Sequence, residues 1–289
     1  MKIIILIPVY NDHKSVSKLI DEINSKVSGL NSLFSIIMVD DASTEQQSIY
    51  VPNLENIQSI QIINMKENRG HARCIAAGLK YIFENEEFDY VIPMDADGED
   101  RPEEIKNFVE YIKYTSDKPI VGERVKRSEN LLFKFFYGFH KILTFVFTGQ
   151  SIKFGNYTCL PKSIVEKMIN DKATWNSFSG ALTKLEKDRS STPSTRGNRY
   201  FGPSKMSFKN LIIHSLSIIS VFKINVLVRS ILFLAVYMFL IHQNISFITI
   251  IPVVLVVIML VLVLSISARE NLNELNNSLL NILNIDRIK

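Results

Sequence analysis

The chain has 289 residues, a formal net charge of +4, 47% hydrophobic residues and 21% charged residues. Soluble domains carry about 25% charged residues, so this chain is poor in charge. The shortage is local, because residues 230–268 contain no Asp, Glu, Lys or Arg, whereas residues 1–125 have an ordinary soluble composition. A wholly soluble enzyme and a polytopic transporter are therefore excluded. The length allows one sizeable globular domain and a small membrane module.

The N-terminal segment and the cysteines indicate that the soluble part lies in a reducing compartment. Cys74 and Cys159 have neither the spacing of metal ligands nor that of a disulfide framework. Residues 2–9 are apolar but too short for the hydrophobic region of a signal peptide, so they predict a buried strand. We expect the catalytic part to face the cytoplasm and expect no nucleic-acid partner.

The first half of the chain alternates β-rich apolar runs with helical patterns, which is typical of parallel strands joined by crossover helices. Apolar positions three and four apart predict helices over residues 15–27 and 70–83, and Pro102 predicts a further helix start. Strands are expected at residues 3–7, 36–39, 60–63, 90–94 and 118–122. The predicted fold class is an α/β catalytic domain of Rossmann-like type, spanning residues 1–205.

Two segments after this pattern have the character of helices that lie at a membrane surface. Residues 131–147 are aromatic-rich and apolar nearly all round, which favours an interfacial helix at about 130–148. The alternative is a core helix of the globular domain. Residues 206–223 carry a polar stripe opposite an apolar one and predict a second, juxtamembrane amphipathic helix.

The uncharged segment predicts a transmembrane hairpin. It is too long for one helix, and the polar triplet at residues 242–244 divides it into two spans of about 20 residues, within residues 224–268. Basic residues precede and follow the hairpin, so the positive-inside rule places both ends in the cytoplasm. Residues 269–289 repeat leucine at helical spacing and predict an amphipathic tail that packs on a neighbouring protomer, in a homo-oligomer, or on its own chain.

Carboxylates follow two of the predicted strands. Asp40 and Asp41 close the second strand, and Asp95 and Asp97 close the fourth. Open α/β sheets bind ligands at the carboxyl ends of their strands. Acidic pairs in one crevice repel each other unless a cation neutralises them, and Mg²⁺ and Mn²⁺ take oxygen ligands. This position favours a divalent metal site over the alternative, a solvated acidic loop.

Four short motifs occur in an order and spacing that resemble a known family. They are Ile7-Pro8-Val9-Tyr10-Asn11, Val39-Asp40-Asp41-Ala42-Ser43, Asn68-Arg69-Gly70 and Asp95-Ala96-Asp97-Gly98-Glu99-Asp100. The chain resembles the family 2 inverting glycosyltransferases of GT-A fold. With its C-terminal hairpin it is similar to their polyprenyl-phosphate branch, over roughly residues 1–268.

The resemblance implies roles for these residues in donor binding. One group would bind the nucleotide and the sugar: Pro8, Tyr10, Asp12, Asp41, Arg69, Gly70, Ala96 and Asn156. A second group would hold Mg²⁺ or Mn²⁺ against the diphosphate: Asp95, Asp97 and Glu99. Asp12 and Glu99 depart from the family pattern, which has Glu and commonly Gln at these positions.

The resemblance also places Arg199, Ser204 and Lys205 in an arginine-containing loop just before the membrane. Displacing a nucleoside diphosphate leaves charge on the diphosphate, which a divalent ion, Arg199 and Lys205 would stabilise. A lipid phosphate is largely dianionic at pH 7 and attacks without a base, whereas a sugar hydroxyl would need Asp100 or Glu99 as general base. Arg124 and Arg127 are expected to receive the lipid phosphate, or else are solvated surface charges.

These observations predict metal-dependent transfer of a hexose from a UDP- or GDP-sugar to a polyprenyl phosphate at the cytoplasmic membrane face. Two alternatives stay open: transfer to a saccharide or glycolipid hydroxyl, and a catalytically silent membrane-bound scaffold that binds nucleotide sugars. Trp175 is expected to pack or to contact the membrane, with contact to the donor sugar as the alternative. The histidines have no metal-ligand spacing and are predicted to be structural or interfacial.

Overall fold

Short parallel strands that are buried on both faces form the centre of the protein. In the computed structural model, which describes residues 1–289 except 46–48, 50–53, 116, 127–130 and 203–206, strand β1 is buried along almost its whole length. It pairs in parallel with β2 and β4, and β2 pairs in parallel with β3. These strands span β1 (Lys2–Val9), β2 (Leu33–Asp40), β3 (Ile57–Met65) and β4 (Tyr90–Pro93). The predicted parallel strands are confirmed.

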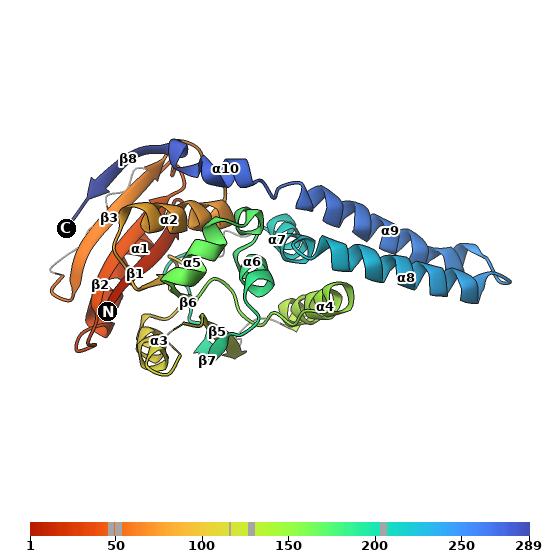
Figure 1. Ribbon diagram of the computed structural model, residues 1–289, viewed down its shortest axis with the longest axis horizontal. Coiled ribbons are helices and arrows are strands. Elements are labelled where there is room, and N and C mark those ends of the chain that lie inside the picture. The colour runs from red at the N-terminus through yellow and green to blue at the C-terminus, as the bar shows by residue number, and fades with distance from the viewer. Residues whose placement is uncertain (46–48, 50–53, 116, 127–130, 203–206) are drawn as a thin grey trace.

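The complete sheet has eight strands in the order β7-β5-β6-β4-β1-β2-β3-β8 (Figure 1). Beyond β4 lie β5 (Ile120–Lys126), β6 (Thr158–Pro161) and β7 (Ser190–Thr195). Strand β6 is antiparallel to β4 and β5, and β7 is parallel to β5. The sheet is therefore mixed, and its parallel half carries the carboxylate motifs.

Helices cover both faces of the sheet. One face packs against α1 (His13–Lys26) and α3 (Ile105–Ile112), which follows the short helix η1 (Pro102–Glu104). The other face packs against α2 (His71–Asn85), α5 (Lys162–Ile169) and α6 (Phe178–Leu185). The apolar residues of α1 recur every three or four positions, as on one helix face, and six of its residues are buried. The result is a three-layer α/β/α arrangement.

A helical hairpin projects from one end of this α/β body (Figure 1). It consists of α8 (Lys223–Ile241) and α9 (Phe247–Ser267), which are both long and apolar enough to span a membrane. Only 11% of the most apolar stretch of α8 and 6% of that of α9 are buried within the protein, so neither is a core helix. The turn between them includes the predicted break at residues 242–244, and Ser246 and Thr249 form a capping box at the start of α9.

Two further helices lie at the base of the hairpin. Helices α4 (Leu131–Thr148) and α7 (Phe208–Ser220) occupy the segments for which interfacial helices were predicted. Helix α4 contacts α8, and α7 contacts α9. Arg229 of α8 donates a hydrogen bond of 3.0 Å to the carbonyl of Val146, near the C-terminal end of α4. The hairpin is therefore fastened to the helices beneath it.

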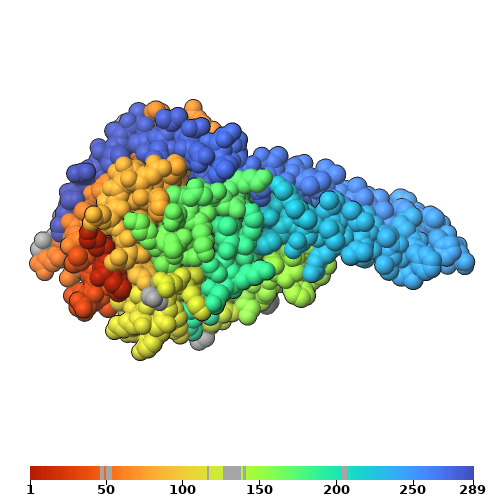
Figure 2. Space-filling view, viewed as in Figure 1, coloured from red at the N-terminus to blue at the C-terminus, as the bar shows by residue number. Residues whose placement is uncertain are grey.

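The C-terminal tail does not form the predicted amphipathic helix. After α9 the chain returns to the α/β body as α10 (Leu272–Asn276), η3 (Ser278–Asn281) and β8 (Ile282–Arg287), and β8 pairs antiparallel with β3. Figure 2 shows the tail lying over the segments of β3 and α2. Leucine spacing predicted a helix here, but the free edge of β3 offers backbone hydrogen-bonding groups that a strand satisfies and a helix does not. Leu275, fully buried, packs with Trp175 and Ala76.

Candidate active site

The strand order of the parallel half reverses between β1 and β4. Strand β1 is followed by β2 and β3 on one side, and the chain then crosses to β4 on the other. Ligands of open α/β sheets bind at such a switch point, outside the carboxyl ends of the strands. The segments that leave β1, β2 and β4 here are residues 10–12, 40–45 and 94–100. The predicted carboxylates therefore lie on one edge of the sheet.

Hydrogen bonds join the loops that leave β1 and β2. Asn11 has the left-handed φ of 52°, and its Oδ1 accepts the backbone N–H of Thr44 at 2.8 Å. Asp40 is buried, and its carboxylate interacts with His13 Nε2 at 2.7 Å and accepts the N–H of Ser43 at 2.7 Å. Burial alone raises the pKa of Asp40, but these hydrogen bonds outweigh it and lower the pKa below its ordinary value. Asn11 and Asp40 therefore fix the conformation of the loops that leave β1 and β2.

Asp41 fixes the loop before helix α2. Its side chain is buried, and its two oxygens accept the backbone N–H groups of Arg69 at 2.9 Å and Gly70 at 2.8 Å. Burial raises the pKa of Asp41 in spite of these hydrogen bonds. Gly70 has a φ of 91°, which favours glycine at this position. Asp41 thus sets the position of the Arg69-Gly70 segment.

The carboxylates after β4 lie close enough to change one another's pKa. The Asp95 carboxylate lies 3.4 Å from His71 Nε2, and that nitrogen lies 2.7 Å from the amide of Asn156. Although burial raises the pKa of Asp95, His71 and the charge of Arg124 lower it below its usual range. Burial and the neighbouring charge of Asp95 raise the pKa of Asp97 to about 6.

Asp100 lies beneath this loop. It is only 6% exposed, and its Oδ2 accepts the backbone N–H of Asp95 at 3.0 Å. Burial and the charge of Asp95 raise the pKa of Asp100 to about 8. These contacts make Asp100 a support for the loop.

The segment that follows β7, residues 196–202, lies across the carboxylates. Arg199 forms ion pairs with Asp97 and, at 3.0 Å, with Asp12, and Arg196 forms an ion pair with Glu99. The backbone N–H of Tyr200 donates to the carbonyl of Asp97 at 2.9 Å. The family resemblance implied one arginine, Arg199, near the diphosphate, and the structure pairs two arginines with the predicted metal ligands Asp97 and Glu99.

Gly98 permits this close approach. Its φ is 87°, and a Cβ atom at this position would lie 2.5 Å from the ring of Tyr200. The Tyr200 hydroxyl donates to Glu22 of α1 at 2.7 Å. Residues 196–202 are thus held against both the carboxylate loop and helix α1.

Asp95 and Asp97 fit a divalent cation better than Glu99 does. The mutual repulsion that raises the pKa of Asp97 is the condition a metal ion relieves. The Asp95 oxygen on this side faces His71 Nε2 at 3.4 Å and accepts no other hydrogen bond among the described residues. Glu99 is engaged by Arg196 instead. Within the described part of the chain, no three His, Cys, Asp or Glu side chains form a group that holds a metal ion. The predicted ligand set of three carboxylates is therefore not assembled here.

The remaining predicted residues are distributed around this edge. Pro8 is buried near the end of β1, Tyr10 is exposed, and Ala96 is buried inside the carboxylate loop. The guanidinium of Arg124 lies against Gly155, where a Cβ atom would come within 2.8 Å of it, and its charge acts on Asp95 and Asp100. Arg127, Ser204 and Lys205 lie outside the described residues.

Sequence reasoning missed His71 and Arg196. His71 was predicted to be structural or interfacial, but it contacts Asp95 in the site. Its position directly after Gly70, at the start of a helix that faces the switch point, was the signal available. Arg196 gave no such signal, because its partner Glu99 is 97 residues away in sequence.

Comparisons with known proteins identify the family of this chain. The model of the family described as "Glycosyl transferase family 2" matches residues 4–174, more than half of the chain. The chain is 29% identical over 225 residues to an undecaprenyl-phosphate 4-deoxy-4-formamido-L-arabinose transferase of Yersinia pestis (strain Pestoides F), covering 73% of this chain and 64% of the relative. The enzyme of the same name from Salmonella choleraesuis is 27% identical with the same coverage. The chain therefore spans less than two thirds of the length of these curated relatives.

Solved structures share the fold. Mannosyl-3-phosphoglycerate synthase from Rubrobacter xylanophilus superposes with a TM-score of 0.54 at 13% identity, covering 76% of this chain and 72% of that one. Glucosyl-3-phosphoglycerate synthase from Mycobacterium tuberculosis, in complex with Mn²⁺, UDP-glucose and phosphoglyceric acid, gives 0.52 at 14% identity, covering 79% of each chain. The chain belongs to glycosyl transferase family 2 and has the GT-A fold.

Proposed function

We propose that this chain is a membrane-anchored glycosyltransferase that moves a hexose from a UDP- or GDP-sugar to a polyprenyl phosphate. The observation that carries the proposal is the meeting of carboxylates and arginines at the switch point, in a chain that also has an apolar hairpin. The names of the undecaprenyl-phosphate transferases among its relatives support the class of acceptor. We assign residues 1–205 to catalysis, 206–223 to the membrane surface and 224–268 to the membrane.

The donor would lie along the edge formed by the β1, β2 and β4 loops. Arg69 and Gly70, whose backbone N–H groups are held by Asp41, would form a wall for the nucleotide. Asp95 and Asp97 would hold Mg²⁺ or Mn²⁺, which would supply positive charge to the diphosphate that leaves the anomeric carbon. Arg199, now paired with Asp97 and Asp12, is placed to donate to the departing diphosphate once it exchanges partners.

The state of Asp100 favours a phosphate acceptor over a hydroxyl acceptor. A hydroxyl needs a general base with access to it, but Asp100 is buried and accepts a backbone hydrogen bond. A phosphate monoester is largely dianionic at pH 7 and attacks the anomeric carbon unaided. Arg124, beside the carboxylate loop, would bind its negative charge.

The membrane arrangement follows from the charges that flank the hairpin. Lys223 at the start of α8 pairs with Glu270, just after α9, at 3.1 Å. This contact keeps both ends of the hairpin on the same side. Because basic residues surround these ends, we place the catalytic domain in the cytoplasm.

The test is a transfer assay with the purified full-length protein in lipid nanodiscs. Undecaprenyl phosphate, Mn²⁺ and each labelled UDP- or GDP-hexose would be incubated together, and we expect a lipid-linked product with one donor. Asp97→Asn should abolish it, whereas Asp117→Asn, an exposed aspartate before β5, should not. Absence of a lipid-linked product with every donor, under conditions where the protein binds nucleotide, would refute the proposal.

A further inference from the structure

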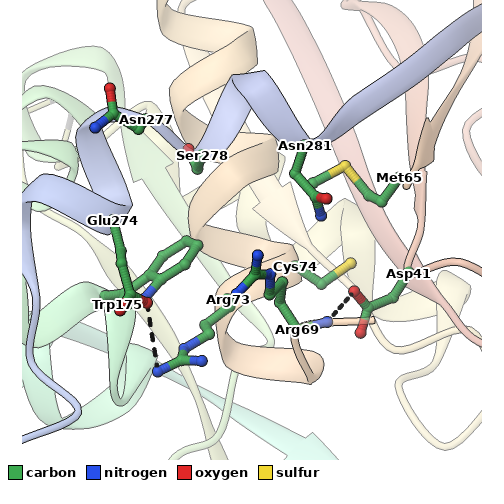
Figure 3. Close-up of a pocket in the computed structure, with 10 residues that line it drawn as sticks. All are labelled: Asp41, Met65, Arg69, Arg73, Cys74, Trp175, Glu274, Asn277, Ser278 and Asn281. Carbon is green, nitrogen blue, oxygen red and sulfur yellow. Dashed lines mark hydrogen bonds and ion pairs between the residues drawn. The ribbon is translucent and has the colours of Figure 1, made fainter. Parts of the chain in front are cut away.

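A small cavity lies between helix α2 and the C-terminal tail. Its volume is about 130 Å³, and it is lined from the α/β body by residues that include Asp41, Arg69 and Trp175. The tail contributes residues that include Ser278 and Asn281. Figure 3 shows the tail crossing above α2, with Asn281 pointing from the tail toward Arg69. The tail, with residues 274–281, therefore shares a cavity with residues 69–74, about 200 residues earlier in the sequence.

The tail is fastened at the place where the nucleotide wall begins. The backbone carbonyl of Asn281 accepts the N–H of Lys66 at 2.7 Å, and its side-chain Nδ2 donates to the carbonyl of Glu67 at 2.9 Å. At the other end of the cavity, Trp175 Nε1 donates to Glu274 at 2.8 Å. These hydrogen bonds hold the tail beside Arg69, two residues after Glu67.

Two polar groups that line this cavity have no hydrogen-bond partner among the described residues. Ser278 is 4% exposed, and among the described residues its hydroxyl has no hydrogen-bond partner. Arg73 also lines the cavity, and its buried Nε has no hydrogen-bond partner among the residues that the structure describes. Buried polar groups are normally hydrogen-bonded, because leaving them unpaired is costly. These groups therefore indicate a ligand that offers hydrogen-bonding atoms inside the cavity.

The lining describes the chemistry of that ligand. The lining includes two arginines, Arg69 and Arg73, and two carboxylates, Asp41 and Glu274, so its formal charges cancel and do not favour an anion. The indole of Trp175, with the guanidinium carbon of Arg73 5.3 Å from its ring centre, forms part of one wall, while the tail provides hydroxyl and amide groups. A cavity of 150 Å³ holds one benzene ring, so about 130 Å³ suits a single six-membered ring. An uncharged planar ring with polar edges matches all of these features.

We propose that the C-terminal tail forms one wall of the nucleobase site, where Ser278 and Asn281 select the pyrimidine base of the donor nucleotide. The inference rests on the proposed function, because the nucleotide sugar is the ligand expected beside Asp41 and Arg69. The inference adds the tail to the residues that bind the donor, and it predicts that the donor nucleotide is UDP and not GDP. It also connects the base to the segment that leaves the membrane hairpin.

The experiment uses the only tryptophan of the chain as a reporter. The full-length protein would be titrated with uridine, UDP and GDP in EDTA, while Trp175 emission is followed. We expect a saturable change with uridine and UDP, and a Kd for GDP higher than that for UDP by about tenfold or more. The same ligands would be tested against Ser278→Val, Asn281→Ala and the control Asn276→Ala, whose exposed side chain is outside the cavity.

Ser278→Val decides the question, because Asn281→Ala also removes the hydrogen bond to Glu67. We expect Ser278→Val to raise the Kd for UDP by about tenfold or more, with an unchanged melting temperature, since it removes the hydroxyl and fills the cavity. Asn276→Ala should bind UDP like the wild type. Wild-type UDP affinity in Ser278→Val, or Trp175 emission that uridine leaves unchanged, would overturn the inference.

The transfer assay separates this inference from the proposed function. Sugar transfer by Ser278→Val with an unchanged KM for the donor would overturn the base site and leave the transferase activity intact. UDP binding that depends on Ser278, in a protein that never forms a lipid-linked product, would refute the activity and support the base site.

Discussion

Arg199 provides the sharpest test of how the site works, because its removal should increase the affinity for Mn²⁺ and decrease the rate of sugar transfer. It pairs with Asp97 and Asp12, and all three side chains are about five-sixths buried, at 16%, 15% and 16% exposure. Hydrogen bonds to charged groups contribute about 1.5–3 kcal/mol, and the partial exposure favours the lower end. A cation that binds Asp97 must displace this interaction, which costs about tenfold in affinity.

Arg199→Ala should therefore bind Mn²⁺ about tenfold more tightly in the absence of donor. It should also transfer sugar about 100-fold more slowly, because a charged donor to the leaving diphosphate is lost. Isothermal titration at pH 8 measures the first effect while Asp97, with its raised pKa of about 6, remains mostly ionised. Arg287→Ala, at an exposed position of β8, is the control. Mn²⁺ affinity equal to or weaker than that of the wild type, in a variant with an unchanged melting temperature, would refute the reasoning.

Three further predictions concern stability. Gly98→Ala should lower the free energy of unfolding by about 1–3 kcal/mol, because its φ is 87° and its Cβ would meet the Tyr200 ring; an unchanged urea midpoint would contradict this. The pKa of Asp100 is raised in the folded protein from 3.8 to about 8, so the stability it contributes is full below about pH 4 and is lost as the pH rises toward 8. In EDTA the melting temperature should fall between about pH 4 and pH 8, and Asp100→Asn should flatten this fall; parallel curves for both proteins would disprove it. Leu275→Ala should destabilise the protein by about 2–4 kcal/mol in urea unfolding and expose the tail to proteolysis, because Leu275 is fully buried, whereas Leu272→Ala, 38% exposed, should do neither.

The parallel half of the fold was predictable because its strands are buried on both faces. The run from Ile3 to Ile7 can only be an interior strand in a soluble domain, and the acidic residues that follow β2 and β4 identify the functional edge. The transmembrane hairpin was equally predictable, since few other structures accommodate a long uncharged segment with one polar break.

The other half carries weaker signals. Strand β7 has the sequence SSTPST, which has no apolar alternation, and it is a strand because β5 provides a pairing edge. Strand β8 reads as part of a leucine-spaced helix until the free edge of β3 is known. A local sequence pattern indicates the secondary structure that a segment prefers by itself. Strands β7 and β8 form instead because β5 and β3, which are distant in sequence, offer strand edges to pair with.

The site divides in the same way. Motif spacing brought Asp41, Asp95 and Asp97 to one edge, since strand ends meet there whatever the details of packing. The ion pair between Arg196 and Glu99 depends on how the chain returns after β7, and no local pattern encodes that. The position of the tail across the cavity from Arg69 depends on a return from the hairpin that sequence periodicity does not describe.

The central claim is that the acceptor is a lipid phosphate, and the most direct measurement compares two acceptors that differ only in that group. Single-turnover transfer of labelled hexose from the preferred donor would be followed in nanodiscs containing undecaprenyl phosphate or undecaprenol. We predict a labelled lipid with undecaprenyl phosphate and none with undecaprenol, because Asp100 is buried and Glu99 is paired with Arg196, so neither predicted base is free to take a proton from a hydroxyl. Transfer to undecaprenol at a comparable rate would contradict the account.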